Sequence, residues 1–383
     1  MAAEELARAG HSVQIAEAKP SVGRKFLMAG KSGLNLTKDE ATEVFLAAYG
    51  EASGPLRPML DALGPEQVQD WARELGQEVF TGSSGRVFPK VMKASPLLRA
   101  WMTRLGDLGV QVNTRWRWSG FDGAGFAFDT PEGAQTVRPA VTVLALGGAS
   151  WARLGSDGAW APWLASKDID IVPFQGANVG LSVIWSDHMT RHFGAPVKGV
   201  SLSAGQTSTR GEFVISAQGV EGGAIYALSK PLREGARLHV DLLPNRSLSE
   251  IETQLARPRG KTTFANHLRK VTKLDPVKLA LLQEFGRPLP EGKPLAKLLK
   301  ALRILHQGAR PMDQAISTAG GVSCDALTKG LMLKPLPGVF VAGEMIDWEA
   351  PTGGYLLTAC LATGRWAGQH AARYLAETRN TQA

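Results

Sequence analysis

The chain has 383 residues, of which 44% are hydrophobic and 20% are charged, and its formal net charge is +8. This balance is typical of a folded globular protein, and the length is sufficient for two or three domains. No apolar run approaches the roughly 18 residues that a membrane-spanning helix needs. The two cysteines, Cys324 and Cys360, are too few for a disulfide framework or a zinc site. We therefore expect a cytoplasmic protein that neither spans a membrane nor binds a metal ion.

Residues 1–17 are predicted to form the second half of a βαβ nucleotide-binding unit, with a helix over 1–10 and a strand over 12–17. The acid that ends the second strand of such a unit accepts hydrogen bonds from a ribose, which predicts that role for Glu17. Glu4 is expected on the solvent side of the helix. The first strand and the Gly-x-Gly-x-x-Gly turn would precede Met1, so we expect about 15 residues of the unit to be missing.

The next segments alternate between helices and strands. Amphipathic helices are predicted over 65–75 and 96–108, followed by a strand over 110–113. A hairpin is expected over 126–139, turning at a Pro-Glu-Gly sequence. The apolar run 141–146 predicts a buried strand that ends in a pair of glycines.

From Phe174 the pattern changes to short alternating strands between glycine-rich turns, which predicts a small antiparallel sheet or barrel. These strands are expected over 177–183, 200–203, 212–215 and 237–242.

A helical stretch follows, beginning at Ser247, which forms a capping box with Glu250. It continues to Arg303 with breaks at several prolines.

The C-terminal part returns to a nucleotide-binding pattern. A strand over 336–341 runs into Gly343 and Glu344, and a helix is predicted from the Pro-Thr-Gly-Gly-Tyr sequence at 351–355 through Ala372. A glycine-rich helix start presents free backbone donors and the positive helix end to an anion or to the edge of a flavin ring.

Together these pieces resemble the FAD-binding domain of the two-dinucleotide-binding-fold flavoproteins. More narrowly, residues 23–37, 85–89, 147–158 and 318–322 resemble a bacterial flavoprotein family that includes aminoacetone oxidase, a bile-acid reductase and a ribosomal-RNA dihydrouridine synthase. The family's usual Gly-Arg-Cys-Asn is Ser-Gly-Leu-Asn at 32–35, and its Ala-Thr-Gly-Gly has Leu146 in place of Thr. These departures predict a divergent branch with a substrate of its own.

The resemblance implies an α/β protein. Its Rossmann-like FAD-binding domain, lacking the first strand and glycine-rich loop, is expected over 1–172 and 312–383. An inserted antiparallel β domain is expected over 173–247 and 304–311, and a small basic helical subdomain over 248–303.

The resemblance also implies which residues contact FAD. They are Glu17, Arg24, Lys25, Gly30, Asn35, Val112, Ala145, Gly147, Gly320, Gly321, Gly343, Glu344, Asp347, Gly353, Gly354, Tyr355 and Leu356.

The catalytic residues are left open. The candidates are Lys31, Asn35, Arg86 and Tyr355. A lysine at the flavin N1 edge would stabilise negative charge on the reduced ring. Each candidate also has an ordinary structural alternative, as a solvated side chain, an ion pair or a packed aromatic.

Positive charge is concentrated between Arg257 and Arg303, which contain twelve Lys or Arg and three acidic residues, a balance of +9. Such a segment is a candidate RNA-binding surface. A solvated helical face is the more common cause of this composition.

The sequence therefore predicts an FAD-dependent oxidoreductase that transfers hydride between bound flavin and an unidentified small-molecule substrate. Whether NADH or NADPH is the reductant is left open. Because no second Gly-x-Gly-x-x-Gly fingerprint is present, we expect any nicotinamide to bind transiently and not in a second dinucleotide fold. Two alternatives remain: a flavin-dependent reductase of a pyrimidine in ribosomal RNA, and a non-catalytic binding protein that has lost its flavin through truncation.

Overall fold

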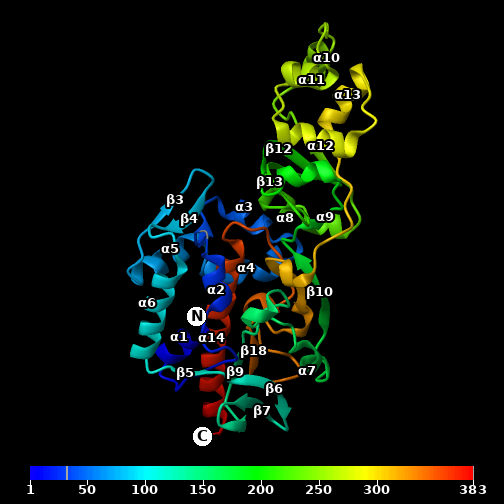
Figure 1. Ribbon diagram of the computed structural model, residues 1–383. Helices are drawn as coiled ribbons and strands as arrows, with labels where there is room; N and C mark the ends of the chain where they lie inside the picture. Colours follow the sequence, from blue (N-terminus) through cyan, green and yellow to red (C-terminus); the bar gives the residue numbers. More distant parts are fainter. Residues whose placement is uncertain (32, 383) are drawn as a thin grey trace. The chain divides into compact units, whose positions relative to one another are not determined.

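The computed structural model describes residues 1–31 and 33–382 (Figure 1). Its Cα positions divide the chain into two compact units. Unit 1 comprises Met1–Gln175 and the segment from Ser317 onward, and unit 2 is Gly176–Ile316. The segments 173–247 and 248–303, which the sequence predicts as separate domains, fall almost wholly within unit 2.

Unit 1 contains two pairs of parallel strands. β1 (Gln14–Glu17) pairs with β5 (Gln111–Thr114), and β9 (Thr142–Leu144) pairs with β18 (Val339–Val341). Parallel strands bring their carboxyl ends, and the turns that follow them, to one edge. In each pair the final residues are partners in register, so the turns after Leu144 and Val341 begin at the same level.

Two helices from opposite ends of the chain lie side by side in unit 1. α1 (Ala2–Arg8) packs along α14 (Tyr355–Gln382), as Figure 1 shows in blue and red. The approach depends on Gly368, because a Cβ there would stand 2.7 Å from the Ala2 Cα. α14 continues beyond the predicted end at Ala372.

The remaining elements of unit 1 form two small antiparallel sheets and the helices around them. One sheet is β2 (Thr37–Lys38), β4 (Arg86–Pro89) and β3 (Val79–Thr81), and the other is β6 (Arg117–Asp122), β7 (Gly125–Thr130) and β8 (Gly133–Val137). The helices are α2 (Arg24–Ala29), α3 (Thr42–Ala47), α4 (Ser53–Ala62), α5 (Pro65–Glu74), α6 (Ala94–Asp107) and α7 (Ala161–Ala165).

Glu4 corrects one expectation about the first helix. The sequence predicted that Glu4 faces solvent, but Glu4 is buried, with 4% of its surface exposed. The carboxylate accepts hydrogen bonds from Arg8, from Arg104 and, at 2.9 Å, from the Trp101 indole N–H. α6 therefore covers the face that helical periodicity alone assigns to water.

Unit 2 is built on the antiparallel sheet that the alternating pattern predicts. Its strand order is β11-β14-β13-β12-β15-β16, with β11 (Leu181–Ser182), β12 (Pro196–Ala204), β13 (Thr207–Ser216), β14 (Gly219–Glu221), β15 (Leu238–Asp241) and β16 (Leu302–Arg303). β12 carries a bulge between Val197 and Val200. Outside this sheet, β17 (Ser317–Val322), which belongs to unit 1, pairs with β10 (Ile171–Ala177), of which residues 171–175 also belong to unit 1.

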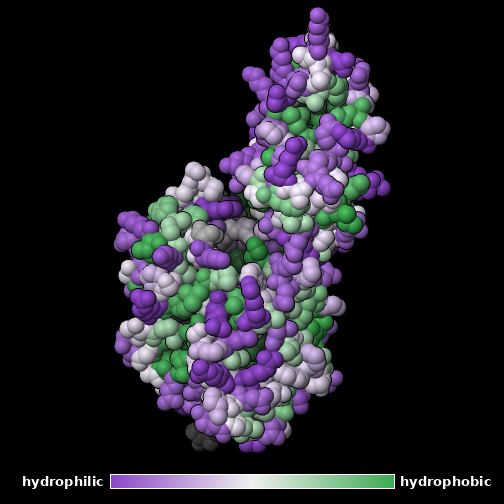
Figure 2. Space-filling view, viewed as in Figure 1, coloured by the Kyte–Doolittle hydropathy of each residue, from purple (hydrophilic) through white to green (hydrophobic). Residues whose placement is uncertain are grey.

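Helices pack on this sheet and close a second hydrophobic core. They are α8 (Gly223–Tyr226), α9 (Ser229–Arg233), α10 (Leu248–Leu255), α11 (Phe264–Thr272), α12 (Pro276–Gly286) and α13 (Gly292–Lys300). The predicted capping box is present, since Ser247 Oγ accepts from the Glu250 N–H and Glu250 accepts from the Ser247 N–H. Hydrophilic side chains cover much of the outer face of these helices (Figure 2).

Candidate cofactor and substrate site

The central feature of unit 1 is the meeting of two glycine turns at the carboxyl ends of β9 and β18. The Ala342 N–H donates to the Leu144 carbonyl at 2.9 Å, which holds the turn at Gly343 beside the turn at Gly147. In open α/β folds, ligands bind at this edge of the strands. The sequence predicts Gly147, Gly343 and Glu344 as FAD contacts; the structure places all three at this edge, and their contact with FAD stays a prediction.

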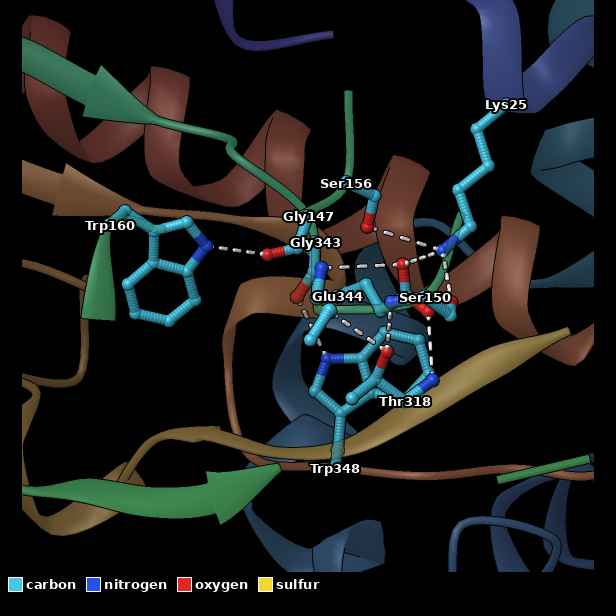
Figure 3. A network of polar contacts seen from close by, with 11 residues as sticks. Lys25, Gly147, Ser150, Ser156, Trp160, Thr318, Gly343, Glu344 and Trp348 are labelled. Atoms are coloured by element: carbon cyan, nitrogen blue, oxygen red, sulfur yellow. Dashed lines mark hydrogen bonds and ion pairs between the residues drawn. The ribbon is translucent and has the colours of Figure 1, made fainter. Parts of the chain in front are cut away.

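Lys25 reaches this edge from α2 (Figure 3). Its ammonium lies 2.5 Å from Glu344 Oε2 and 3.0 Å from Ser150 Oγ, with Ser156 Oγ at 3.5 Å. Glu344 also accepts from the backbone N–H of Thr318 at 3.0 Å. A cation, a carboxylate and two hydroxyl groups are thus gathered at one point of the strand edge.

The backbone around this network is fixed by side-chain hydrogen bonds. Thr318 Oγ1 accepts from the N–H groups of Ala149 and Ser150, at 3.0 and 3.2 Å. Two indoles clamp the turns: Trp160 donates to the Gly147 carbonyl, and Trp348 donates to the Gly343 carbonyl (Figure 3). Such constraints pre-organise a polar site instead of leaving it to be ordered by the ligand.

Glu17 ends β1 and forms a second polar corner. One carboxylate oxygen accepts from the Lys19 N–H at 2.8 Å. Burial raises the pKa of Glu17, and the Lys19 N–H and the charges of Lys19 and Arg24 oppose that rise. A Cβ on Gly155 would lie 3.4 Å from Lys19 Cγ, so the segment 150–158 connects this corner to the Lys25 network.

Asn35 has a feature that fits a bound group. Its Oδ1 is buried and has no hydrogen-bond partner among the residues that the structure describes, whereas buried polar atoms in folded proteins are almost always paired. Lys31 is exposed, and Ser32 lies outside the described residues.

The departures from the family's first loop have a structural account. Leu34, where the family usually has Cys, is fully buried in the core. Gly33, where the family usually has Arg, has φ +118° and a Cβ there would be 2.7 Å from Met92 Cε. Substituting an L-residue at Gly33 would therefore strain the loop.

Several glycines predicted to contact FAD are needed for packing within the protein. An added Cβ would collide with Ala94 at Gly30, with the Pro173 carbonyl at Gly320, with the Met345 carbonyl at Gly321 and with Thr37 at Gly354. Gly147, Gly343 and Gly353 have more room. Cofactor contact stays a prediction for all of them.

The other predicted contacts are dispersed around unit 1. Val112 is paired with Ile15 between β1 and β5, and Ala145 is exposed just after β9. Asp347 Oδ1 accepts from the Gly320 N–H at 3.1 Å. Arg24 donates to Ser21, and Leu356 is partly buried in the first turn of α14.

Tyr355 belongs to a cluster that the sequence did not predict. Its hydroxyl donates to Glu40 Oε1 at 2.5 Å and accepts from Lys38 Nζ at 2.8 Å. Lys38 and Glu40 also pair with each other at 2.7 Å. The sequence offered one indication that Lys38 and Glu40 belong to a site, namely their position directly after the 23–37 motif. No local sequence pattern links them to Tyr355.

Burial and charge act together on this cluster. Burial raises the pKa of Tyr355, Glu40 raises it further, and Lys38 opposes both. For Lys38, burial alone would lower the pKa, but hydrogen bonds to Glu40 and Tyr355 outweigh it and raise the pKa. The phenol therefore stays protonated and the lysine stays charged at neutral pH.

One face of the sheet β2-β4-β3 extends from this cluster. Lys38 is the cross-strand partner of Arg86, and Phe80 is the partner of Phe88. Because side chains alternate along a strand, these four share a face, while Val87 points into the core. The two phenylalanine rings stack at 5.8 Å, and Phe80 is 41% exposed.

The described residues contain no cluster of His, Cys, Asp and Glu suited to a metal ion. They also contain no helix long and apolar enough to cross a bilayer. The location of the protein in the cell stays a prediction.

The glycine turns at the ends of β9 and β18, the acid that ends β1 in the other parallel pair, and the Lys25 network are typical of a Rossmann-type nucleotide-binding protein. Residues 1–370 match the family described as HI0933-like protein Rossmann domain. The chain belongs to this family of FAD-binding Rossmann proteins, which confirms the predicted family and fold class.

A curated relative is the 3-dehydro-bile acid delta(4,6)-reductase of Clostridium scindens, which is 26% identical over 390 residues, 94% of this chain and 92% of the relative.

Two solved flavoenzyme structures have a similar fold. The 3-ketosteroid delta1-dehydrogenase of Sterolibacterium denitrificans matches with a TM-score of 0.52 and 12% identity, over 97% of each chain. The FrdA subunit of E. coli quinol fumarate reductase matches with a TM-score of 0.50 and 13% identity, over 98% of this chain and 69% of that one. At these identities, the likeness describes the fold alone.

Proposed function

We propose that the protein is an FAD-dependent oxidoreductase that reduces a carbon–carbon double bond conjugated to a carbonyl in a small, largely apolar substrate. Family membership over residues 1–370 supports the flavin. The substrate class is supported by the relative named as a bile-acid reductase, which aligns over 94% of this chain. The same relative favours a small molecule over the alternative of a ribosomal-RNA pyrimidine.

The cofactor is assigned to the carboxyl edge of the parallel strands. Glu17 would accept hydrogen bonds from the adenosine ribose, and Lys25 with Glu344 would bind the flavin half of the molecule. The unpaired Asn35 Oδ1 supports a bound donor nearby. When bound, the flavin would take up a hydride from the electron donor and, in its reduced form, pass it to the substrate.

The proposal depends most on one observation, the position of the Tyr355 hydroxyl between Lys38 and Glu40. A double bond reduced by hydride at one carbon needs one proton at the carbon next to the carbonyl. The Tyr355 hydroxyl, held between Lys38 and Glu40, is suited to donate that proton. Lys38 would stabilise the phenolate that remains, and Glu40 orients the hydroxyl.

The face that carries Lys38, Arg86, Phe80 and Phe88 is assigned to the substrate. Stacked rings offer a flat apolar surface for a carbocyclic ring. Arg86 is exposed at the same face and offers a fork of donors for a carboxylate or carbonyl oxygen.

A reductase also requires an electron donor, and NADH or NADPH binding transiently is the proposed source. The test is an oxygen-free assay with FAD, NADH or NADPH, and a 3-dehydro-4,6-diene bile acid as probe, the class named for the relative. We expect Tyr355→Phe to lower kcat by about a hundredfold, the lower range for losing a general acid. Flavin reduction by the nicotinamide, followed by absorbance, should not change.

The matched control is Tyr374→Phe, a second tyrosine on α14 that contacts Phe340. It should turn over the probe at the wild-type rate. The proposal is wrong if Tyr355→Phe also keeps the wild-type kcat, or if no conjugated ketone oxidises the reduced flavin.

A further inference from the structure

Unit 2 contains a pocket of about 190 Å³ whose lining shares no residue with the proposed cofactor and substrate sites. Three segments form it: the β12 bulge at Gly199, the loop 242–246, and the stretch 272–278, which runs from the last residue of α11 into the first turn of α12.

The charged side chains that line the pocket are all basic. They are Arg246, Lys273 and Lys278, and Asn245 adds an amide. No ion pair joins these three cations to a carboxylate in the described part of the chain. The pocket is thus rich in donors and poor in negative charge.

The nearest carboxylates in the sequence are already engaged. Asp275 caps α12 by accepting from the Lys278 N–H at 2.8 Å. Asp241 pairs with Lys300 at 2.6 Å. Neither provides an ion pair for the pocket cations.

Lys278 shows the imbalance most clearly. Its side chain is partly buried, and within the described residues its Nζ donates to a backbone carbonyl, that of Gly199, at 3.4 Å, and to no carboxylate. Burial lowers the pKa of Lys278, and the more distant charges of Asp275 and Asp241 oppose this only in part. A bound anion would provide the missing negative charge.

Lys273 occupies a backbone position that glycine would fill with less strain. It follows α11 with φ +56°, the left-handed conformation typical of glycine at a helix end. The lysine at this position adds an exposed basic side chain to the lining of the pocket. Asn245 is oriented by Arg210, which donates to its Oδ1 and leaves the amide N–H groups as donors.

From this lining we infer that the pocket binds a phosphate group. One guanidinium, two ammonium groups and an amide line the pocket, and none of the three cations is paired with a carboxylate among the described residues. Arg246 donates to Gln254 Oε1 at 2.7 Å and Lys278 to the Gly199 carbonyl, but a guanidinium has five N–H groups and an ammonium has three, so both keep further donors. Phosphate oxygens accept charge-assisted hydrogen bonds from such groups. The group could belong to a free phosphorylated small molecule or to the backbone of an RNA, since both present the same chemistry.

The first test is calorimetric titration of the full chain with inorganic phosphate against chloride at constant ionic strength. Wild type should bind one phosphate saturably. Lys278→Gln and Lys273→Gly should each weaken binding by about tenfold, as expected for one charge-assisted contact. Lys273→Gly also suits the left-handed backbone, so its thermal stability should not fall.

The control is Lys293→Gln, an exposed lysine of α13 outside the pocket. It makes the same charge change as Lys278→Gln and should bind phosphate like wild type. Absence of saturable binding, or equal weakening in Lys293→Gln, would overturn the inference.

A second titration distinguishes the sources of the phosphate. A short RNA duplex that competes with inorganic phosphate and binds less tightly to Lys273→Gly would identify a polynucleotide ligand. If the duplex does not compete, the pocket accepts free phosphates. Both RNA outcomes agree with a phosphate-binding pocket, provided that the first titration shows saturable binding of inorganic phosphate.

Discussion

Lys25 and Glu344 lie 319 positions apart in the sequence, yet their charged atoms are 2.5 Å apart at the edge where β9 and β18 end. The Glu344 side chain is 12% exposed and that of Lys25 is 29% exposed. The pair therefore joins α2 to the turn after β18 in a place where water screens charge poorly.

Replacing Lys25 with Met should destabilise the fold and weaken FAD binding. The change leaves the Glu344 carboxylate largely buried without its cation, which costs roughly 2 kcal/mol of the free energy of unfolding, between the values for exposed and buried pairs. FAD affinity should fall about tenfold. Denaturant unfolding and flavin fluorescence titration measure the two effects.

Lys90→Met is the matched control for this change. Lys90 pairs with Glu78 at 3.9 Å, and both side chains are well exposed. The loss should be below about 0.5 kcal/mol. Equal losses in the two variants would show that the Lys25 pair has no special role.

Tyr355 should remain protonated above pH 10. Its pKa is raised by burial and by Glu40 from the ordinary value of 10.0. Because the folded state holds this proton more tightly than the unfolded state, its contribution to stability is full below pH 10 and is lost as pH rises through the raised pKa. Ultraviolet titration of wild type against Tyr355→Phe measures this, and a Tyr355 transition below pH 10 would contradict the described environment.

Glu4→Ala should be a stability variant with an effect at acid pH. Burial alone would raise the pKa of Glu4, but hydrogen bonds from Arg8, Trp101 and Arg104 outweigh it and lower the pKa. The stability it contributes is present above its unfolded pKa of 4.5 and is lost as pH falls through the lowered value. We expect the free energy of unfolding, measured with urea, to fall by about 3 kcal/mol at neutral pH. The difference between the variant and wild type should become smaller in acid. An equal difference at neutral and acid pH would contradict a lowered pKa of Glu4.

Glu17→Ala should weaken FAD about tenfold without changing the unfolding midpoint, because one hydrogen-bonded carboxylate is removed from a ligand site and not from the core. Glu66→Ala is a suitable control, since Glu66 is exposed on α5. If the two variants bind FAD equally well, Glu17 does not hold the ribose.

Cys360 should resist alkylation in the folded protein. Burial raises its pKa to about 12, Glu344 adds to the rise, and little thiolate exists at neutral pH. Burial likewise raises the pKa of Cys324. Mass spectrometry after iodoacetamide treatment should show little modification until denaturant is added, whereas rapid labelling of Cys360 would contradict its described surroundings.

The sequence predicted those parts of the site that follow directly from a strand or a glycine motif. Glu17, Gly147 and Glu344 each end a strand or its turn, so local pattern was enough to propose them as FAD contacts. Lys38 and Glu40 were missed because their partner, Tyr355, is 315 positions from Glu40. No local pattern encodes a pairing made by β2 and the start of α14.

Glu4 shows that a local pattern also fails to predict which side chains are buried by distant segments. Helical periodicity alone placed it toward solvent, but Trp101 and Arg104 of α6 cover it and complete its hydrogen bonds. In the same way, the alternating pattern predicted the sheet of unit 2, but not the basic pocket beside its bulge. That pocket is assembled from three segments that approach one another only in the folded chain.

The most direct test of the central claim is a crystal structure of the protein grown with FAD. The account predicts the adenosine ribose hydroxyls within hydrogen-bonding distance of Glu17, and the flavin half of the molecule beside Lys25 and the Gly343–Glu344 turn. FAD bound at full occupancy without contact to Glu17 or to the Lys25 network would contradict it.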